Sequence, residues 1–406
     1  MTIKTRCSKR AILARLGPIA VFVTVSLLAP APVQAIPAFA RQFNAKCSTC
    51  HEPLPPRLNN LGITFKRLGY RLPDVDDQGR LVLKDKPSQS LLENFSLIGD
   101  IRLEKFRGKP TPLSMHEVEL VGGGTAGPHL SFSTEVAWEA GEFSLDRYDA
   151  QVLLGRPEAN FTARFGQVAP LLWDKFGSQR LGIARASVLN RRVPVGAFVG
   201  YRPRDPMEGL ELGVNLTRAA AEGGTMRSTF LSLGLYNGLT QAGNDFGENN
   251  GSKDVLAQVL HLFGEANTIG ALWYHGKATK IGTTAFDDTY SRFGVFGNYV
   301  LGHGADVLGG FMTGRDEATI STIGRISSRS WFLELDQTIA PRTAAFFRYD
   351  RFEPRRPEAS VTVGGPTLGV ACQALDHLLL TGEYTGQKVG TKQRGRDLVV
   401  RATVIY

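Results

Sequence analysis

The chain has few cysteines and, after residue 35, no long apolar run. Four cysteines in 406 residues are too few for the dense disulfide framework of a small secreted domain. After residue 35 no stretch reaches the roughly 18 apolar residues of a membrane helix, which excludes helical membrane spans. Phosphate-binding loops and nucleophile motifs are also missing. The sequence therefore does not indicate a helical membrane protein, a hydrolase or a transferase.

The first 35 residues contain no acidic side chain. Five basic residues come first, an apolar segment covers residues 16–29, and residues 33–35 offer the small side chains that a signal peptidase requires. The apolar segment is short and is interrupted by Pro18, so a cleaved signal peptide (residues 1–35) is favoured over a membrane anchor. Cleavage lowers the basic count from 47 to 42 (47 − 5) against 38 acids, which leaves about +4 and indicates no nucleic-acid partner.

A five-residue motif, Cys47-Ser-Thr-Cys-His51, dominates what is present. Two cysteines two residues apart, followed directly by histidine, are typical of c-type haem attachment. The thiols of Cys47 and Cys50 would each form a bond to one vinyl group of the porphyrin, and His51 would bind the iron as its proximal ligand. A zinc site would need two further ligands, and a thioredoxin-like site would need a preceding strand and a longer helix. The motif predicts one covalent haem c held by Cys47, Cys50 and His51, at a site outside the cytoplasm.

Residues 36–70 resemble a known family. The matching positions are Cys47, Cys50, His51, Pro56, Leu58, Asn59, Gly62, Phe65, Lys66, Gly69 and Tyr70. The pattern is similar to that of outer-membrane cytochrome–porin fusions, in which a single-haem domain is joined to a β-barrel. This family includes the outer-membrane cytochromes of iron-oxidising bacteria. The chain differs from those members directly after His51, where they carry aromatic and histidine residues and it carries Glu-Pro-Leu-Pro-Pro.

A small helical domain and its linker are expected over residues 36–90. A short helix is expected over residues 37–45. A second helix is expected to start at Pro56 and to end at Gly69, with Leu58, Leu61, Phe65 and Leu68 on the face towards the porphyrin. Residues 73–90 are polar without a clear period and are expected to be the linker. A domain of this size buries little surface by itself. The haem and the barrel wall are therefore expected to complete its core.

The sixth ligand of the iron is weakly specified. Between residues 52 and 114 there is neither methionine nor histidine. The nearest candidates are Met115, His116 and His129, and strand parity would point His129 into the barrel lumen. The alternative is that both histidines are ordinary turn or lumen residues. A five-coordinate iron, or one capped by lysine or asparagine, is equally open.

From residue 91 the chain is expected to form an outer-membrane β-barrel. Short runs alternate between apolar and polar residues, as at Leu210, Leu212, Val214 and Leu216 against Glu211, Gly213, Asn215 and Thr217. The strands recur about every 20 residues, which suits about 16 antiparallel strands with apolar side chains towards lipid and polar ones towards the lumen. Residues 398–406 alternate up to a terminal aromatic, an ending that resembles the recognition signal of such barrels. Cys372 is expected to be an apolar filler on a strand. The fold class is all-β, with a small α-helical haem domain at the N-terminus.

Residues 166–192 interrupt the alternation. This segment is too long for a turn and contains Arg180, Arg185, Arg191 and Arg192. It resembles the infolded loop of phosphate-type porins, and long ordered loops usually narrow a pore. It would form a basic constriction or contact the haem propionates; the alternative is a solvated surface that balances acids of the lumen.

Three functions agree with these features. The first is an electron carrier between an extracellular donor or acceptor, ferrous iron among them, and a periplasmic c-type cytochrome. This protein could act as an iron:cytochrome oxidoreductase. The second is a solute-conducting porin with the haem domain as plug or sensor. The third, a peroxidase, needs a distal acid–base group that the haem domain does not supply. The first is preferred, and the expected location is the bacterial outer membrane in contact with lipid.

Overall fold

A computed structural model describes residues 38–85, 91–105, 112–139, 141–177, 180–191, 193–195, 198–199, 206–218, 226–238, 251–280, 286–317, 324–355, 362–390, 392–393 and 397–405. The predicted signal peptide, Arg192 and Tyr406 lie outside these ranges. None of the helices in the described part is long and apolar enough to cross a membrane.

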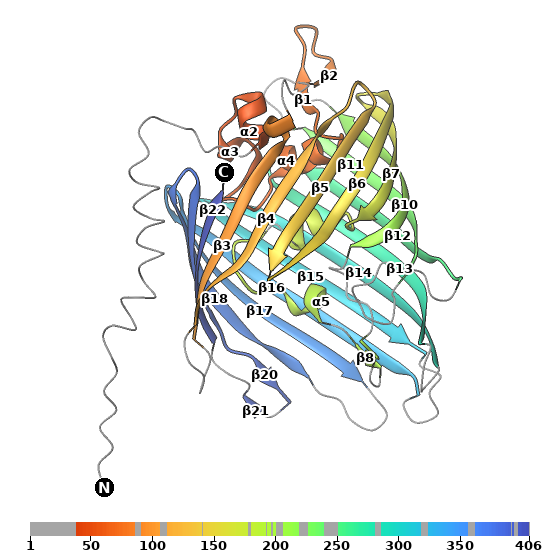
Figure 1. Cartoon of the computed structure of the whole chain (residues 1–406), viewed down its shortest axis with the longest axis vertical. Helices are drawn as coiled ribbons and strands as arrows, with labels where there is room; N and C mark the ends of the chain where they lie inside the picture. The colour runs from red at the N-terminus through yellow and green to blue at the C-terminus, as the bar shows by residue number, and fades with distance from the viewer. Residues whose placement is uncertain are drawn as a thin grey trace. The chain divides into compact units, whose positions relative to one another are not determined.

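Sixteen long antiparallel strands of the described residues close into a barrel (Figure 1). In chain order they are β3 (Phe95–Lys105), β4 (Leu113–Thr125), β5 (Leu130–Glu139), β6 (Glu142–Arg156), β7 (Ala159–Val168), β10 (Met207–Arg218), β11 (Arg227–Tyr236), β12 (Asp254–Phe263), β13 (Asn267–Lys280), β14 (Phe286–Gly302), β15 (Ala305–Asp316), β16 (Ile326–Ala340), β17 (Thr343–Arg355), β18 (Val363–Leu375), β19 (Leu378–Thr385) and β22 (Asp397–Ile405). The last strand pairs with the first, Val400 opposite Leu103, so the sheet has no free edge. The predicted barrel and its strand number are confirmed.

Among the described residues, two hairpins of short strands occur between the long strands, and only the second of them belongs to the barrel sheet. One is β8 (Pro194–Val195) with β9 (Phe198–Val199), and the other is β20 (Lys388–Val389) with β21 (Lys392–Gln393). The second lies within the connection between β19 and β22, and β20 also pairs with β18. It therefore extends the wall at one end.

Burial alternates along the strands in the order expected for a barrel with a polar interior. On β10, Leu212 is 42% exposed on the outside, whereas Glu211 is 3% exposed on the inside. The same alternation runs along β16, where Trp331 and Leu333 face outwards and Glu334 and Asp336 are buried. A water-soluble sandwich would bury the apolar face instead, so the apolar outer wall is the feature of a membrane barrel.

Most connections at one end of the barrel are shorter than those at the other; the exceptions join β5 to β6 and β10 to β11. Turns of two to four residues join β4 to β5, β6 to β7, β12 to β13, β14 to β15, β16 to β17 and β18 to β19. Because the strands are antiparallel, these turns share one end, here called the short-turn end, where β3 begins and β22 stops. The opposite, long-loop end carries the connections over residues 169–206 and 237–253.

Residues 38–85 precede the barrel strands and are here called the N-terminal module. It contains α2 (Ala38–Phe43), α3 (Cys47–Cys50), α4 (Asn60–Arg67) and the hairpin β1 (Leu72–Val75) with β2 (Leu81–Lys84). A turn of 3-10 helix, η1 (Leu91–Asn94), leads into β3. The predicted linker over residues 73–90 is therefore wrong for residues 73–84, which belong to this hairpin; Asp76 to Gly79 form its tip, stabilised by Arg80.

The segment over residues 169–193 is here called the infolded loop, and its described residues 169–177, 180–191 and 193 enter the lumen. The predicted segment started three residues early, because β7 continues to Val168. It contains a π-helical turn, η2 (Trp173–Gly177), and α5 (Ser187–Asn190). Its side chains Leu172, Phe176 and Leu189 pack in one buried cluster with Phe296 and Phe332 of the wall. Ile63 of α4 belongs to the same cluster, so the loop and the module share a core inside the barrel.

Candidate haem-attachment site

The two motif cysteines lie on α3, a single helical turn without a buried residue. Both are free thiols and half-buried. Burial, and next the neighbouring Cys47, raise the pKa of the Cys50 thiol to about 11, so it is protonated at neutral pH. One helical turn places positions 47 and 50 on the same side, as attachment to two vinyl groups of one ring requires.

His51 directly follows α3 and is held by the backbone. Its Nδ1 lies 3.2 Å from the carbonyl oxygen of Arg57, and because a carbonyl can only accept, Nδ1 carries the proton. Burial lowers the pKa of His51, which favours the neutral ring. A neutral imidazole protonated on Nδ1 leaves the Nε2 lone pair free. This is the state in which histidine binds a metal, so the motif residues fit a covalent haem.

The helix after the motif packs directly against α3. Asn59 caps α4 by accepting from the Gly62 N–H at 2.9 Å, and its amide donates to the Thr49 carbonyl at 3.0 Å. A Cβ on Gly62 would lie 2.5 Å from the Cys50 carbonyl oxygen. The helix begins at Asn60 rather than at Pro56, because residues 51–58 form an antiparallel bridge between His51 and Leu58.

An aromatic cluster forms the core of the module. Phe65 packs edge-on against Phe39 and Phe43, with centroid distances of 5.1 and 5.4 Å, and Tyr70 stacks on Phe39 at 4.8 Å. Phe39 and Tyr70 also lie against the backbone of Gly123 on β4. Ile63, on another side of α4, belongs to the buried cluster that also contains side chains of the infolded loop and of the wall, so the predicted single apolar face of this helix is too narrow. The wall and the loop complete the core of the module.

Backbone acceptors fasten the module to the short-turn end. Asn60 donates its side-chain amide to the carbonyls of Phe263, Gly264 and Asn267 at 3.0–3.1 Å, around the turn between β12 and β13. Arg71 donates to the Gly127 carbonyl at 2.8 Å, in the turn between β4 and β5. These bonds place the module at the mouth that also holds both ends of the barrel sheet.

Arg57 joins the haem motif to the barrel wall. Its guanidinium is 1% exposed and donates to Glu334 at 2.6 Å and to Asp336, both on β16. Removing one partner of such a buried pair leaves a charge unpaired, which costs about 3–5 kcal/mol. Ionic contacts therefore hold the module in its position at the barrel wall, here called its seat, together with the hydrogen bonds.

The infolded loop holds the module from the other side. Asp174 of η2 is fully buried and accepts from Lys66 at 2.6 Å and from Arg67, two successive residues of α4. Lys175 donates to the Leu58 carbonyl at 3.0 Å and to the Ala266 carbonyl at 3.3 Å. Burial lowers the pKa of Lys66 to about 8 and that of Lys175 to about 8, although carboxylates oppose the shift.

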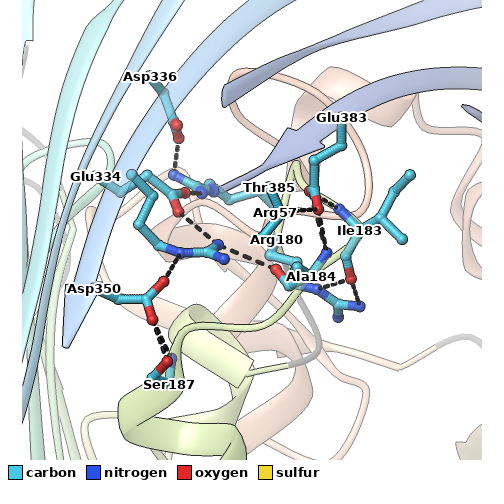
Figure 2. A network of polar contacts seen from close by, with 11 residues as sticks. Arg57, Arg180, Ile183, Ala184, Ser187, Glu334, Asp336, Asp350, Glu383 and Thr385 are labelled. Carbon is cyan, nitrogen blue, oxygen red and sulfur yellow. Dashed lines mark hydrogen bonds and ion pairs between the residues drawn. The ribbon is translucent and has the colours of Figure 1, made fainter. Parts of the chain in front are cut away.

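A polar network continues from Arg57 along the infolded loop (Figure 2). Arg348 donates to the second oxygen of Glu334 at 3.2 Å and to Asp350 at 3.1 Å, and Asp350 accepts from Ser187. Glu383 accepts the backbone N–H groups of Ile183 at 2.6 Å and of Ala184 at 3.0 Å. Wall carboxylates thus bind the loop mostly through its backbone. Both predicted roles of its arginines remain predictions.

The candidates for the sixth ligand lie on β4 and in the turn that follows it. Met115 is 48% exposed on the outside of β4, eight residues from Gly123 and thus about 26 Å along the strand from the point where the module contacts it. His116 lies next to it and pairs with Glu139 at 3.5 Å. His129 is exposed in the turn between β4 and β5, where its Nδ1 lies 3.0 Å from the Leu153 carbonyl. Cys47 and Cys50 lie on α3 and His51 directly follows it, whereas Met115 and His116 lie far along β4 from the module. The role of His129 as a ligand stays a prediction.

Several residues of the site were not identified from the sequence. Arg57, Asn60, Asp174 and Glu334 make the contacts that seat the module, yet each stands alone in its stretch of sequence. A weak signal existed in three cations, Arg57, Lys66 and Arg67, on a segment that otherwise predicted a buried helix.

Comparisons with known proteins agree on the fold. No family model and no curated protein match the chain. Among solved structures, a loop-deletion mutant of the outer membrane protein OmpT of Vibrio cholerae has a TM-score of 0.54 at 15% identity, covering 77% of this chain and 98% of that one. An anion-selective porin from Comamonas acidovorans has a TM-score of 0.53 at 13% identity, covering 77% and 98%. The barrel therefore has the fold of these outer-membrane proteins.

Proposed function

We propose that the protein is an outer-membrane barrel carrying one covalent haem c in a module that closes its periplasmic mouth, and that it carries electrons across the membrane. In outer-membrane barrels the short turns are periplasmic and the long loops extracellular. The short-turn end, with the module, is then periplasmic. A c-type cytochrome of the periplasm would exchange electrons there.

The observation that carries this proposal is the buried ionic seat of the module. Arg57 binds Glu334 and Asp336 of the wall, and Lys66 and Arg67 bind Asp174 of the infolded loop. A haem on α3 would thus be held at the lumen by charges that cannot separate cheaply. A bound haem supplies reversible one-electron chemistry at its iron. A permanent seat suits an electron carrier better than a plug that must leave to let solutes pass.

The electron donor or acceptor on the outside is proposed from the family resemblance alone. Ferrous iron is the donor we test first, which would make the protein an iron:cytochrome oxidoreductase. Electron flow in the opposite direction uses the same parts.

A second function, a solute-conducting porin with the module as plug or sensor, is favoured by the comparisons. One of the similar structures is described as an anion-selective porin. The infolded loop of this chain places the cations Lys175 and Arg180 inside the barrel, where both donate to backbone carbonyl oxygens. This reading predicts ion flux that does not depend on haem.

Proteoliposomes distinguish the two functions. The purified protein is reconstituted into vesicles that contain oxidised cytochrome c, and ferrous iron is added outside without oxygen. Electron transfer predicts reduction of the enclosed cytochrome, which a His51→Ala variant loses. Planar-bilayer conductance is measured on the same preparations.

Each outcome has a clear meaning. Reduction without conductance supports the electron carrier. Conductance equal in the parent and in His51→Ala, without reduction, supports the porin. A haem that dithionite reduces but iron does not would retain the cytochrome and remove iron as its donor.

A further inference from the structure

We propose that Arg57 is a positioning residue for the haem ligand His51, and that the barrel wall orients the ligand through it. This role rests on the proposed function, because it concerns the same haem. Its basis is that one residue makes both contacts. The backbone of Arg57 binds the imidazole of His51, and its side chain binds two carboxylates of β16.

The backbone contact comes from a tight loop. The Arg57 carbonyl accepts from the Glu52 N–H at 3.1 Å as well as from His51 Nδ1 at 3.2 Å. The Arg57 N–H in turn donates to the Leu54 carbonyl at 3.1 Å. Residues 51–57 therefore form a closed turn, and the position of the Arg57 carbonyl sets the plane of the His51 ring.

The side-chain contact fixes that carbonyl to the wall. The guanidinium of Arg57 binds Glu334 and Asp336 and lies 3.7 Å from Asp306 on β15. Glu334 is itself held by Arg348 at 3.2 Å. Planar guanidinium groups engage two carboxylates in a defined geometry, which an ammonium group does not reproduce. The turn therefore cannot shift without disturbing four charged groups of the wall.

A hydrogen bond to the second nitrogen of a ligating histidine fixes the ring and raises its basicity. A more basic ligand stabilises the oxidised iron. Loosening the Arg57 carbonyl should therefore raise the reduction potential of the haem. Loss of a positive charge near the iron would lower the potential, so positioning and charge effects have opposite signs.

The test uses two matched variants of the full-length protein in detergent, Arg57→Lys and Arg67→Lys. Both arginines are buried in the module and paired with carboxylates, but the Arg67 carbonyl accepts from Gln151 at 2.9 Å and not from His51. Both replacements keep the charge. The midpoint potential is measured by a spectroscopic redox titration, and the ligand geometry by electron paramagnetic resonance of the oxidised haem.

Arg57→Lys should raise the midpoint potential and change the resonance spectrum, and Arg67→Lys should do neither. Equal values in the parent and in Arg57→Lys would overturn the role of Arg57, as would the same shift in both variants. A parent protein without covalent haem would overturn the proposed function first, and this role with it. The parent's haem content therefore separates the two failures.

Discussion

At the scale of the residue, three side chains carry the proposed chemistry and a few others hold them. His51 has one nitrogen occupied by the Arg57 carbonyl and the other free. Asn59 and Gly62 join α3 to α4 within hydrogen-bonding and van der Waals distance. The site is therefore sensitive both to the reactive groups and to the small residues around them.

Replacing Cys47 and Cys50 together by alanine should abolish the covalent haem, because no thiol then remains on α3. The measurement is haem-dependent peroxidase staining after denaturing electrophoresis. Cys372→Ser is the matched control, since Cys372 lies on β18 against Thr343 and should leave the stain unchanged. Persistent stain in the double variant would remove the haem from the proposal.

Replacing Gly62 by alanine should destabilise the module by about 1–3 kcal/mol, the usual cost of overpacking. The added methyl group would approach the Cys50 carbonyl oxygen and the Leu58 side chain. The expected result is a module cleaved at lower protease concentration, seen by gel electrophoresis. Gly99→Ala is the control, because no atom lies within 4 Å of its added Cβ. Equal resistance of the two variants would mean that α4 shifts without cost.

The motif of Cys47, Cys50 and His51 can be recognised in the sequence because its signal is local: two thiols and an imidazole at fixed spacing. The haem itself stays a prediction. Arg57 and Asp174 could not be assigned, because their meaning depends on partners far away in the chain. Arg57 and Asp336 are 279 residues apart, and Lys66 and Asp174 are 108 apart. A single sequence does not say which of the many lumen carboxylates such a cation meets.

At the scale of the element, the infolded loop holds α4 in place through an ion pair. Asp174 makes the ionic contact between them, and it is fully buried between Lys66 and Arg67. Burial alone would raise the pKa of Asp174, but the charges of Arg67 and Lys66 outweigh it and hold the pKa well below its usual range. The Asp174 carboxyl group is therefore ionised at neutral pH.

Asp174→Asn should weaken the seat of the module by about 3–5 kcal/mol, because two buried cations lose their carboxylate. A thermal unfolding curve in detergent should show the loss at neutral pH. Asp77→Asn, at an exposed position of the hairpin tip, is the control and should have little effect. A curve like that of the parent would show that Lys66 and Arg67 find other partners.

The same ion pair predicts a pH dependence. A carboxylate whose pKa is depressed by folding stabilises the folded state above its unfolded pKa of about 4 and loses this contribution as the pH falls further. The parent should therefore keep a constant seat stability from neutral pH down to about 4 and lose stability below it. Asp174→Asn should show a smaller loss in that acid range. An acid loss of equal size in both would assign it to other carboxylates.

Elements were predicted with uneven success, and the reasons are physical. The short helix before the motif was predicted because Phe39 and Phe43 share one side, and it is present as α2. The start of α4 was placed four residues early, since a proline that could open a helix lies instead in the bridge of His51 with Leu58. The hairpin of β1 and β2 was missed because the polar residues at its tip are also typical of a linker.

At the scale of the whole molecule, the barrel is a wall with an apolar outside. Period-two alternation predicts this arrangement directly, because side chains of a strand point to opposite faces. The number of strands follows from their spacing. The position of the module in the barrel cannot be predicted in this way, because it depends on which strands and turns become neighbours in the folded barrel.

Leu212→Arg should destabilise the barrel by about 2–4 kcal/mol if the outer face lies at the middle of a bilayer. Leu212 is exposed on the outside of β10, midway along the strand. Denaturant unfolding in lipid vesicles measures the change, and Leu212→Met at the same position should be nearly neutral. A similar small effect of both would place this face in water.

The pairing of β22 with β3 also has a consequence for biosynthesis. The sheet becomes a ring only when its final strand is made, and Glu334 and Asp336, which hold Arg57, belong to the last quarter of the chain. Such long-range contacts form late. The nascent N-terminus must therefore wait, with its charges in water and its thiols accessible, until nearly the whole polypeptide has been exported. If the chain carries the proposed haem, an enzyme that attaches it would have access to Cys47 and Cys50 during this time, before the barrel closes.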